Sequence, residues 1–277
     1  MKTSAAIITA EDVRRFEEDG YWISPKLIDD DRIDRLRQAC DRIWAGDHDG
    51  DGYPMYGGFI SQMDPQRIRK LDNGFWVNDE VRSMVTDPII GSLAAALLGT
   101  DEVRLWHDQV ITKPGVAEGA TNAGNVGWHQ DYGYWQCAST SNMLTVWIAL
   151  QDTDLSNGGM MSIAGSHKWG LIPDSNTFFD QDLDALKDKY TAVGRDWKEE
   201  PCILKAGEAS FHHALTFHGS GQNYSAAPRH SIVAHLMPRG TGYLPNVQWH
   251  PNIRLLGPRP YAGQLFDNEY FPVVYKK

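Results

Sequence analysis

Residues 143–150 limit how this chain can fold more than any other stretch, because they are apolar on both faces of an extended segment. Such a strand must be covered on both sides, as in the middle of two stacked sheets. Further short strands are predicted at residues 102–113, 160–163, 201–205, 208–211 and 229–237. Helices are predicted ahead of most of these strands, between Thr9 and Gly20 and at about 30–44, 79–86 and 88–98.

Helices followed by many short strands indicate a mainly β fold with peripheral helices. The expected architecture is a double-stranded β-helix, the cupin-like jelly roll. A chain of 277 residues can bury one sizeable core, and it carries no internal repeat or Pro-rich linker. We therefore predict a single domain over residues 1–277. Its helical N-terminal part covers about 1–100, its jelly-roll core about 101–240 and its C-terminal extension 241–277.

The charge of the chain restricts its partners. The formal net charge is −10 and the pI is near 5.4, whereas nucleic acids and anionic membranes require a basic surface. The same charge fits poorly with a polyanionic substrate such as a CoA ester. No run approaches the length of a membrane span. We expect a small-molecule substrate, no nucleic acid and no membrane, while the oligomeric state stays open.

The cysteines indicate the compartment. Cys40, Cys137 and Cys202 are odd in number and far apart, as expected of small core residues in a reducing environment. The apolar stretch at the N-terminus is too short for a signal peptide. These features predict a cytoplasmic protein.

The segment Trp128-His129-Gln130-Asp131 contains the first candidate site. Only His129, among the ten histidines, has a carboxylate two residues later. Alternation along a strand puts the side chains of His129 and Asp131 on one face. An imidazole and a carboxylate aimed the same way supply two thirds of a facial iron site, which needs one more histidine. Aromatic flanks predict a substrate pocket around this pair, although for Tyr134 and Trp135 ordinary core packing is an equal alternative; the flanking residues are Trp128, Tyr132, Tyr134 and Trp135.

A second stretch, His218 to Arg229, offers the third histidine. His218 competes with His212 and His213, either of which could instead line the pocket or be a hydrogen-bonded core residue. His213 is our candidate for the pocket. Arg229 follows His218 by eleven residues and opens an apolar run. The intervening turn residues would place Arg229 on the next antiparallel strand, beside the metal strand. Its guanidinium can bind a ligand carboxylate through two parallel hydrogen bonds. The alternative is a structural salt bridge to an Asp or Glu of the fold.

Read together, the two stretches resemble the phytanoyl-CoA dioxygenase-like family of non-haem iron, 2-oxoglutarate-dependent oxygenases. Further segments stand in the order that this family uses, and the resemblance covers roughly residues 10–240. These segments are Phe16 to Tyr21, Thr145 to Asp152, Asn157 to Gly159 and Ala164 to His167.

The resemblance implies a function and a set of roles. His129, Asp131 and His218 would hold Fe(II), and Arg229 would bind the far carboxylate of 2-oxoglutarate with help from Ser220. Trp147 would line the cosubstrate pocket. Three weaker candidates for that pocket rest only on their positions in inward-facing strands; they are Thr145, Gln109 and Lys113. With O2 as cosubstrate, the expected outcome is hydroxylation of an unactivated carbon in a small organic molecule, for example in natural-product metabolism.

Two alternatives from other classes stay open. One is a zinc enzyme of cupin type that uses no keto acid and gives Arg229 no role. The other is a non-catalytic small-molecule binding protein of the same fold. In the oxygenase, residues 115–127 and 174–200 are expected to form the lid, because neither stretch shows a core pattern apart from a charged helix at 182–190.

Overall fold

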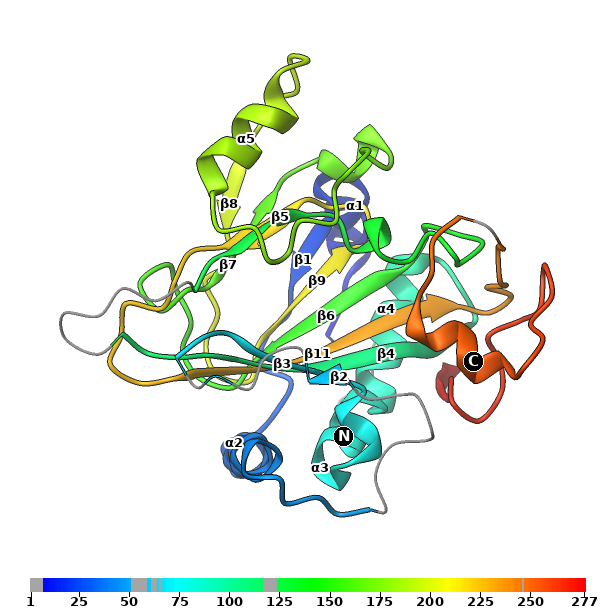
Figure 1. Cartoon of the computed structure of the whole chain (residues 1–277), viewed down its shortest axis with the longest axis horizontal. Helices are drawn as coiled ribbons and strands as arrows, with labels where there is room; N and C mark the ends of the chain where they lie inside the picture. Colours follow the sequence, from blue (N-terminus) through cyan, green and yellow to red (C-terminus); the bar gives the residue numbers. More distant parts are fainter. Residues whose placement is uncertain (1–6, 51–58, 61–63, 65, 117–123, 246) are drawn as a thin grey trace.

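The computed structural model describes residues 7–50, 59–60, 64, 66–116, 124–245 and 247–277. Two antiparallel sheets face each other (Figure 1), which confirms the predicted jelly roll. The major sheet has the order β1 (Tyr21–Ile23), β9 (Ala209–His213), β6 (Leu144–Ala149), β11 (Arg229–Pro238), β4 (Glu102–Lys113), β3 (Arg69–Asp72) and β2 (Phe59–Ile60), with β12 (Val273–Lys276) paired to β4. The minor sheet has the order β5 (Val126–His129), β10 (His218–Ser220), β7 (Met160–Ile163) and β8 (Glu199–Pro201).

Alternation along the major sheet separates two environments. In β6, Leu144, Val146 and Ile148 face outward into the largest hydrophobic cluster, whereas Trp147 and Ala149 belong to a cluster between the sheets. Every residue of β6 is buried, as the apolar run predicted. The predicted strand at 201–205 is largely wrong, since β8 ends at Pro201 and Leu204 only forms an isolated bridge with Thr153.

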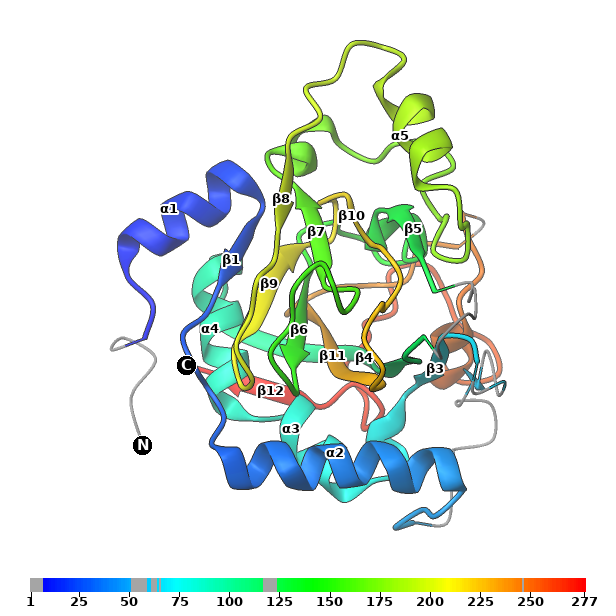
Figure 2. The same ribbon diagram turned by 90° about the vertical axis from the view of Figure 1, so that its left-hand side faces the viewer.

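Four helices cover the outer face of the major sheet (Figure 2) and confirm the predicted ones. They are α1 (Ala10–Asp19), α2 (Asp30–Ala45), α3 (Asp79–Val85) and α4 (Pro88–Leu98). The local signals act as expected: Thr9 caps α1 in a capping box, and Gly20 ends it with a φ of 80°. In α4 Pro88 occupies the first turn and Gly99 the left-handed end.

Residues Asp79–Leu98 are long and apolar enough to cross a membrane, with a mean hydropathy of 1.3. The expectation that no run approaches the length of a membrane span is therefore wrong for this stretch. The segment is not one helix, however, because it breaks between α3 and α4 at Thr86 and Asp87. It packs against the major sheet, and 61% of the apolar window is buried. The apolar composition of this segment is therefore explained by its burial against the sheet.

The segment after β7 is anchored to the minor sheet. The helix predicted at 182–190 is α5 (Leu183–Thr191), capped by Asp182. Leu186 and Tyr190 are buried in a cluster on the outer face of this sheet, so residues 174–200 contribute to a hydrophobic cluster although their sequence shows no core pattern. Of the other expected lid segment, residues 117–123 lie outside the described residues. The C-terminal extension adds η5 (Pro251–Leu256) and the strand β12.

Candidate metal centre

A cavity of about 270 Å³ lies between the sheets. Strands of both sheets, the segment around Phe178 and the C-terminal extension contribute to its walls. Ten of the residues predicted for the site line the cavity: Gln109, His129, Asp131, Tyr134, Trp135, Thr145, Trp147, His218, Ser220 and Arg229.

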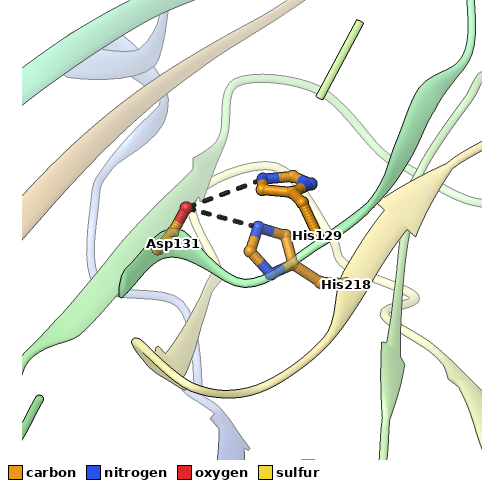
Figure 3. A group of neighbouring side chains, drawn as sticks. All are labelled: His129, Asp131 and His218. Carbon is orange, nitrogen blue, oxygen red and sulfur yellow. Dashed lines mark ion pairs between the residues drawn. The ribbon is translucent and has the colours of Figure 1, made fainter. Parts of the chain in front are cut away.

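His129, Asp131 and His218 converge at one point of this cavity (Figure 3). His129 ends β5 and lies directly opposite His218, the first residue of β10. Nε2 of each ring is close to Oδ1 of Asp131, at 3.6 Å for His129 and 3.7 Å for His218. One ligand atom from each residue lies within 4.8 Å of the others, all three residues being buried. This arrangement suits a single metal ion with three protein ligands and open positions.

The backbone between His129 and Asp131 differs from the expected strand. Gln130 is extended, with φ −109° and ψ 130°, but Asp131 begins the 3-10 turn η3 (Asp131–Gly133). The Gln130 side chain fixes this corner, since it donates to the carbonyls of Gly170 and Leu215. The two side chains still converge because the single extended residue between them preserves the alternation.

Both imidazoles are held in one tautomer by backbone carbonyls. Nδ1 of His129 donates to the Gly127 carbonyl at 2.7 Å, and Nδ1 of His218 to the Thr216 carbonyl at 3.0 Å. A carbonyl only accepts, so the lone pair of each ring is on Nε2, which faces Asp131. Burial and the neighbouring imidazoles lower the pKa of His218 well below its ordinary value, which keeps the ring neutral.

Asp131 stays ionised inside this shell. Burial would raise the pKa of its carboxyl, but interactions with His218, His129 and His212 hold it well below the ordinary value. The second oxygen, Oδ2, accepts a short hydrogen bond from the Thr145 hydroxyl. The Thr145 bond occupies Oδ2 and leaves Oδ1 for a metal.

The structure separates the two histidines that competed with His218. His212 is buried with its Nε2 3.4 Å from Oδ2 of Asp131 and its ring 4.3 Å from that of His218. His213 points to the other side of β9, where its Nδ1 accepts from the Leu215 amide and its ring lies 5.6 Å from that of His167. The placement of His213 in the substrate pocket is therefore wrong, because neighbouring residues of a strand face opposite ways.

Two predicted aromatic residues also lie outside the pocket. Trp128 precedes His129 in β5 and points outward, where its ring packs 5.2 Å from that of Trp197. Tyr132 packs in a cluster at the far end of the sheets and donates its hydroxyl to the Ala138 carbonyl. Neither lines the cavity.

Arg229 lies at the other end of the cavity, with its side chain 3% exposed. Its guanidinium carbon is 4.9 Å above the Trp147 ring. Nε and Nη1 find no hydrogen-bond partner among the described residues. Burial lowers the pKa of Arg229 to about 9. Arg229 opens β11 in the major sheet, so the prediction that it lies beside the metal strand is wrong: β10 belongs to the opposite sheet.

Lys113 is the strand partner of Arg229, which places two buried basic residues together. Lys113 was predicted to line the cosubstrate pocket, but it does not line the cavity. Its Nζ instead crosses to the minor sheet, where it donates to the Ser220 hydroxyl at 2.6 Å and to the Gly221 carbonyl. Ser220 Oγ, which lines the cavity, accepts from Lys113 and so keeps its own proton for a ligand. Burial and the nearby Arg229 lower the pKa of Lys113 well below its ordinary value.

The donor set fits both an iron ion and a dicarboxylate. Two imidazole nitrogens and one carboxylate oxygen are suitable ligands for Fe(II). Within the described residues no carboxylate forms an ion pair with Arg229, and a buried unpaired guanidinium calls for an anion. An acid with one carboxylate near the metal and one near Arg229 would satisfy both ends of the cavity.

Several cavity residues were not predicted from the sequence. His107 and His235 lie on inward faces of the major sheet, where alternation from Gln109 would have located His107 and alternation from Arg229 would have located His235. His212, which was left open between metal ligand, pocket and core, also lines the cavity. Others come from segments with no periodic pattern. These are Phe178 and Phe179 after β7, and Gln248, Trp249, His250 and Asn252 in the C-terminal extension.

Known proteins share this fold and sequence pattern. The family model for phytanoyl-CoA dioxygenase (PhyH) matches residues 16–231. The peroxisomal phytanoyl-CoA dioxygenase of Bos taurus is 22% identical over 242 residues, covering 86% of this chain and 71% of that enzyme. The ectoine dioxygenase of Streptomyces avermitilis is 27% identical over 247 residues, covering 81% and 77%.

Solved structures agree with the fold. The carbocyclase SnoK from nogalamycin biosynthesis, described as non-heme and alpha-ketoglutarate dependent, matches with a TM-score of 0.73 and 24% identity over 98% of each chain. The epimerase SnoN from the same biosynthesis matches with a TM-score of 0.74 and 24% identity, covering 96% of this chain and 98% of SnoN.

Proposed function

Because this chain belongs to the phytanoyl-CoA dioxygenase (PhyH) family and is an Fe(II)- and 2-oxoglutarate-dependent dioxygenase, we propose that it hydroxylates an unactivated carbon of a small organic molecule in the cavity between its sheets. The family assignment decides against the zinc enzyme and the non-catalytic binding protein. The observation that carries the proposal is a three-residue ligand set at one end of a cavity and an unpaired buried arginine at the other.

The metal ligands of the proposal are His129, Asp131 and His218. Their Nε2, Oδ1 and Nε2 atoms face one point, and hydrogen bonds behind each ligand fix its direction. Iron with 2-oxoglutarate and O2 supplies the oxidising power for attack on a C–H bond. The protein positions the reactants and keeps water away, since the cavity lies between two sheets.

The cosubstrate residues are Arg229, Ser220 and Trp147. Arg229 can fork onto the far carboxylate, and Ser220 can donate the proton that its bond from Lys113 leaves free. Trp147 holds the guanidinium from one side. Gln109 contributes to this part of the cavity wall, whereas Thr145 lies at the metal end beside Asp131.

We place the substrate among neutral or weakly charged organic molecules of natural-product type. The net charge of −10 opposes a CoA ester, the substrate class in the name of the bovine relative. SnoK and SnoN, both of nogalamycin biosynthesis, agree with a natural product. The free cysteines, Cys40, Cys137 and Cys202, are all buried, in keeping with a cytoplasmic protein.

The test is the visible charge-transfer band that forms when 2-oxoglutarate chelates protein-bound Fe(II) without oxygen. The unmodified protein and His213→Ala should both develop the band, because His213 points away from the cavity. His218→Ala should stay folded and lose it, together with most of its iron affinity. A band of full strength in His218→Ala would refute this ligand set, and no band in the unmodified protein would refute the site.

A further inference from the structure

Four polar residues lie side by side across the cavity floor on the major sheet. His107 on β4 pairs with His235 on β11, His235 with Thr145 on β6, and Thr145 with His212 on β9. We call these four the histidine row. All four are buried and line the cavity. Thr145 and His212 contact Asp131, so the row runs from the metal ligand toward the C-terminal extension.

Hydrogen bonds determine which nitrogen of His235 carries the proton. The Thr145 hydroxyl has one proton and donates it to the Asp131 carboxylate, which can only accept. Thr145 Oγ1 must therefore accept from Nδ1 of His235, 2.8 Å away. This leaves Nε2 of His235 as a lone-pair acceptor. Nε2 is buried and has no partner in the described part of the chain.

His107 extends this unsatisfied polar surface. Its ring lies 4.3 Å from that of His235, and neither of its nitrogens has a partner within the described residues. Burial lowers the pKa of His107 to about 3, so the ring is neutral and offers one donor and one acceptor. Buried polar groups without partners are costly, and their grouping in a cavity points to a ligand that satisfies them.

The remaining wall on this side combines aromatic residues with uncharged amide side chains and has no net charge. Trp135 packs edge-on against the rings of both His235 and His107, at 4.7 and 5.8 Å. Lys70 and Asp72 both line the cavity but pair with each other at 2.7 Å. A charged substrate group would therefore lose its water without gaining an opposite charge.

We propose that the histidine row recognises an uncharged, ring-containing substrate that donates a hydrogen bond from a hydroxyl or N–H group to Nε2 of His235, with His107 binding a second polar atom. The aromatic side chains of Tyr134, Trp135 and Phe178 would enclose the ring. This substrate class rests on the proposed function. It excludes CoA esters and permanently charged substrates.

Three bicyclic probes of similar size test the proposal. 2-Naphthol has the donor, 2-methoxynaphthalene keeps the oxygen without the proton, and 2-naphthoate adds a charge. Binding is measured by calorimetry without oxygen, on protein loaded with Fe(II) and 2-oxoglutarate. We expect 2-naphthol to bind about tenfold more tightly than 2-methoxynaphthalene, the effect of one lost hydrogen bond, and 2-naphthoate to bind more weakly than both.

Variants then assign the donor contact. His235→Phe should bring the affinities for 2-naphthol and 2-methoxynaphthalene to within about twofold of each other. His107→Leu should weaken the binding of 2-naphthol. His213→Phe, on the outer side of β9, should behave as the unmodified protein. Equal binding of the first two probes to unmodified protein, a preference for 2-naphthoate, or no binding of any probe would overturn the inference.

The probe comparison uses unmodified protein and does not depend on the variants folding. The charge-transfer band separates the two hypotheses. If the band forms while the probes do not discriminate, the substrate class is wrong and the proposed function stands. If the band does not form, the proposed function itself fails.

Discussion

At the scale of single residues, the buried side chain of Arg229, unpaired within the described chain, indicates that an anionic ligand binds beside it. The side chain is buried beside a second basic residue, Lys113, and two of its nitrogens have no partner among the described residues. Removal of one partner of a buried charged pair costs about 2–5 kcal/mol, a factor of roughly thirty to several thousand in affinity. Arg229→Ala should weaken 2-oxoglutarate binding by this factor and leave Fe(II) affinity nearly unchanged, as measured by titration of the charge-transfer band.

Two further variants make this test specific. Arg229→Lys should recover only part of the affinity, because an ammonium group cannot form the fork. Arg239→Ala, in an exposed residue just beyond the other end of β11, is the matched control and should change nothing. A dissociation constant for 2-oxoglutarate that is unaltered in Arg229→Ala would assign the cosubstrate elsewhere.

At this scale the sequence predicted the short-range part of the site. His129 and Asp131 could be paired because alternation acts within three residues. The same rule, applied to Trp128 and to His213, would have turned both away from the cavity, so those errors were avoidable. Alternation could also have placed His107 and His235 on inward faces, but their arrangement side by side with His212 depends on the register of four strands far apart in the sequence.

At the scale of single elements, the contacts of α5 predict how the segment beside the metal ligands is held in place. Leu186 and Tyr190 anchor it in a small cluster, and the Tyr190 hydroxyl donates to the Asp174 carbonyl at 2.7 Å. The preceding segment is bonded to the minor sheet, since the Gly127 amide donates to the Phe178 carbonyl. The segment therefore forms a wall beside the metal ligands, and its stability should depend on the α5 cluster.

Leu186→Ala should loosen this wall locally. A buried leucine changed to alanine typically costs about 2–5 kcal/mol, and a satellite cluster can open without the main core. Hydrogen exchange measured by mass spectrometry should rise over residues 172–191 and stay unchanged in β6 and β11. Leu155→Ala, at an exposed position, should alter neither region. Faster exchange throughout the chain would show that α5 belongs to the main folding unit instead.

Helices were easier to predict than short strands, for a physical reason. Caps such as Thr9 and Gly99 act within a few residues, so they are visible in the sequence. The strand β10 has only three residues, too few for a periodic pattern, and its identity depends on its neighbours β5 and β7. The sequence thus placed His218 near His129 at the end of a strand, but it predicted neither the bounds of that strand nor the sheet to which it belongs.

For the molecule as a whole, Asp108 links stability to pH. Its carboxyl is buried in β4, where burial raises its pKa from the ordinary 3.8 to about 8. Between about pH 4 and pH 8 the folded protein keeps this proton while the unfolded chain releases it, so the stability of the fold falls as pH rises through this range. Asp108→Asn cannot ionise and should not show this loss.

The measurement is the difference in melting temperature between Asp108→Asn and the unmodified protein. This difference should increase from pH 5 to pH 8 in favour of the variant. Asp101→Asn, at an exposed position, is the control and should give a difference that stays constant with pH. A constant difference for Asp108→Asn as well would mean that the buried carboxyl ionises as easily as a free one.

The jelly roll could be predicted at this scale from the order of helices and strands, but the division of strands between sheets could not. Consecutive strands β10 and β11 looked like neighbours in one sheet, yet they belong to opposite sheets. Such pairing is decided by how the two sheets close over their shared apolar side chains, which no local pattern records.

That division has a consequence for how such a protein can diversify. His129 and His218 are on the minor sheet, with Asp131 just beyond β5, whereas the histidine row is on the major sheet. The two sets meet where Thr145, His212 and His235 approach Asp131 and where the ring of His212 packs against that of His218. Mutations at His107 or His235 can therefore alter which molecules are accepted while the ligand strands are inherited unchanged. Descendants of this chain could acquire new substrates through one sheet and keep their chemistry on the other.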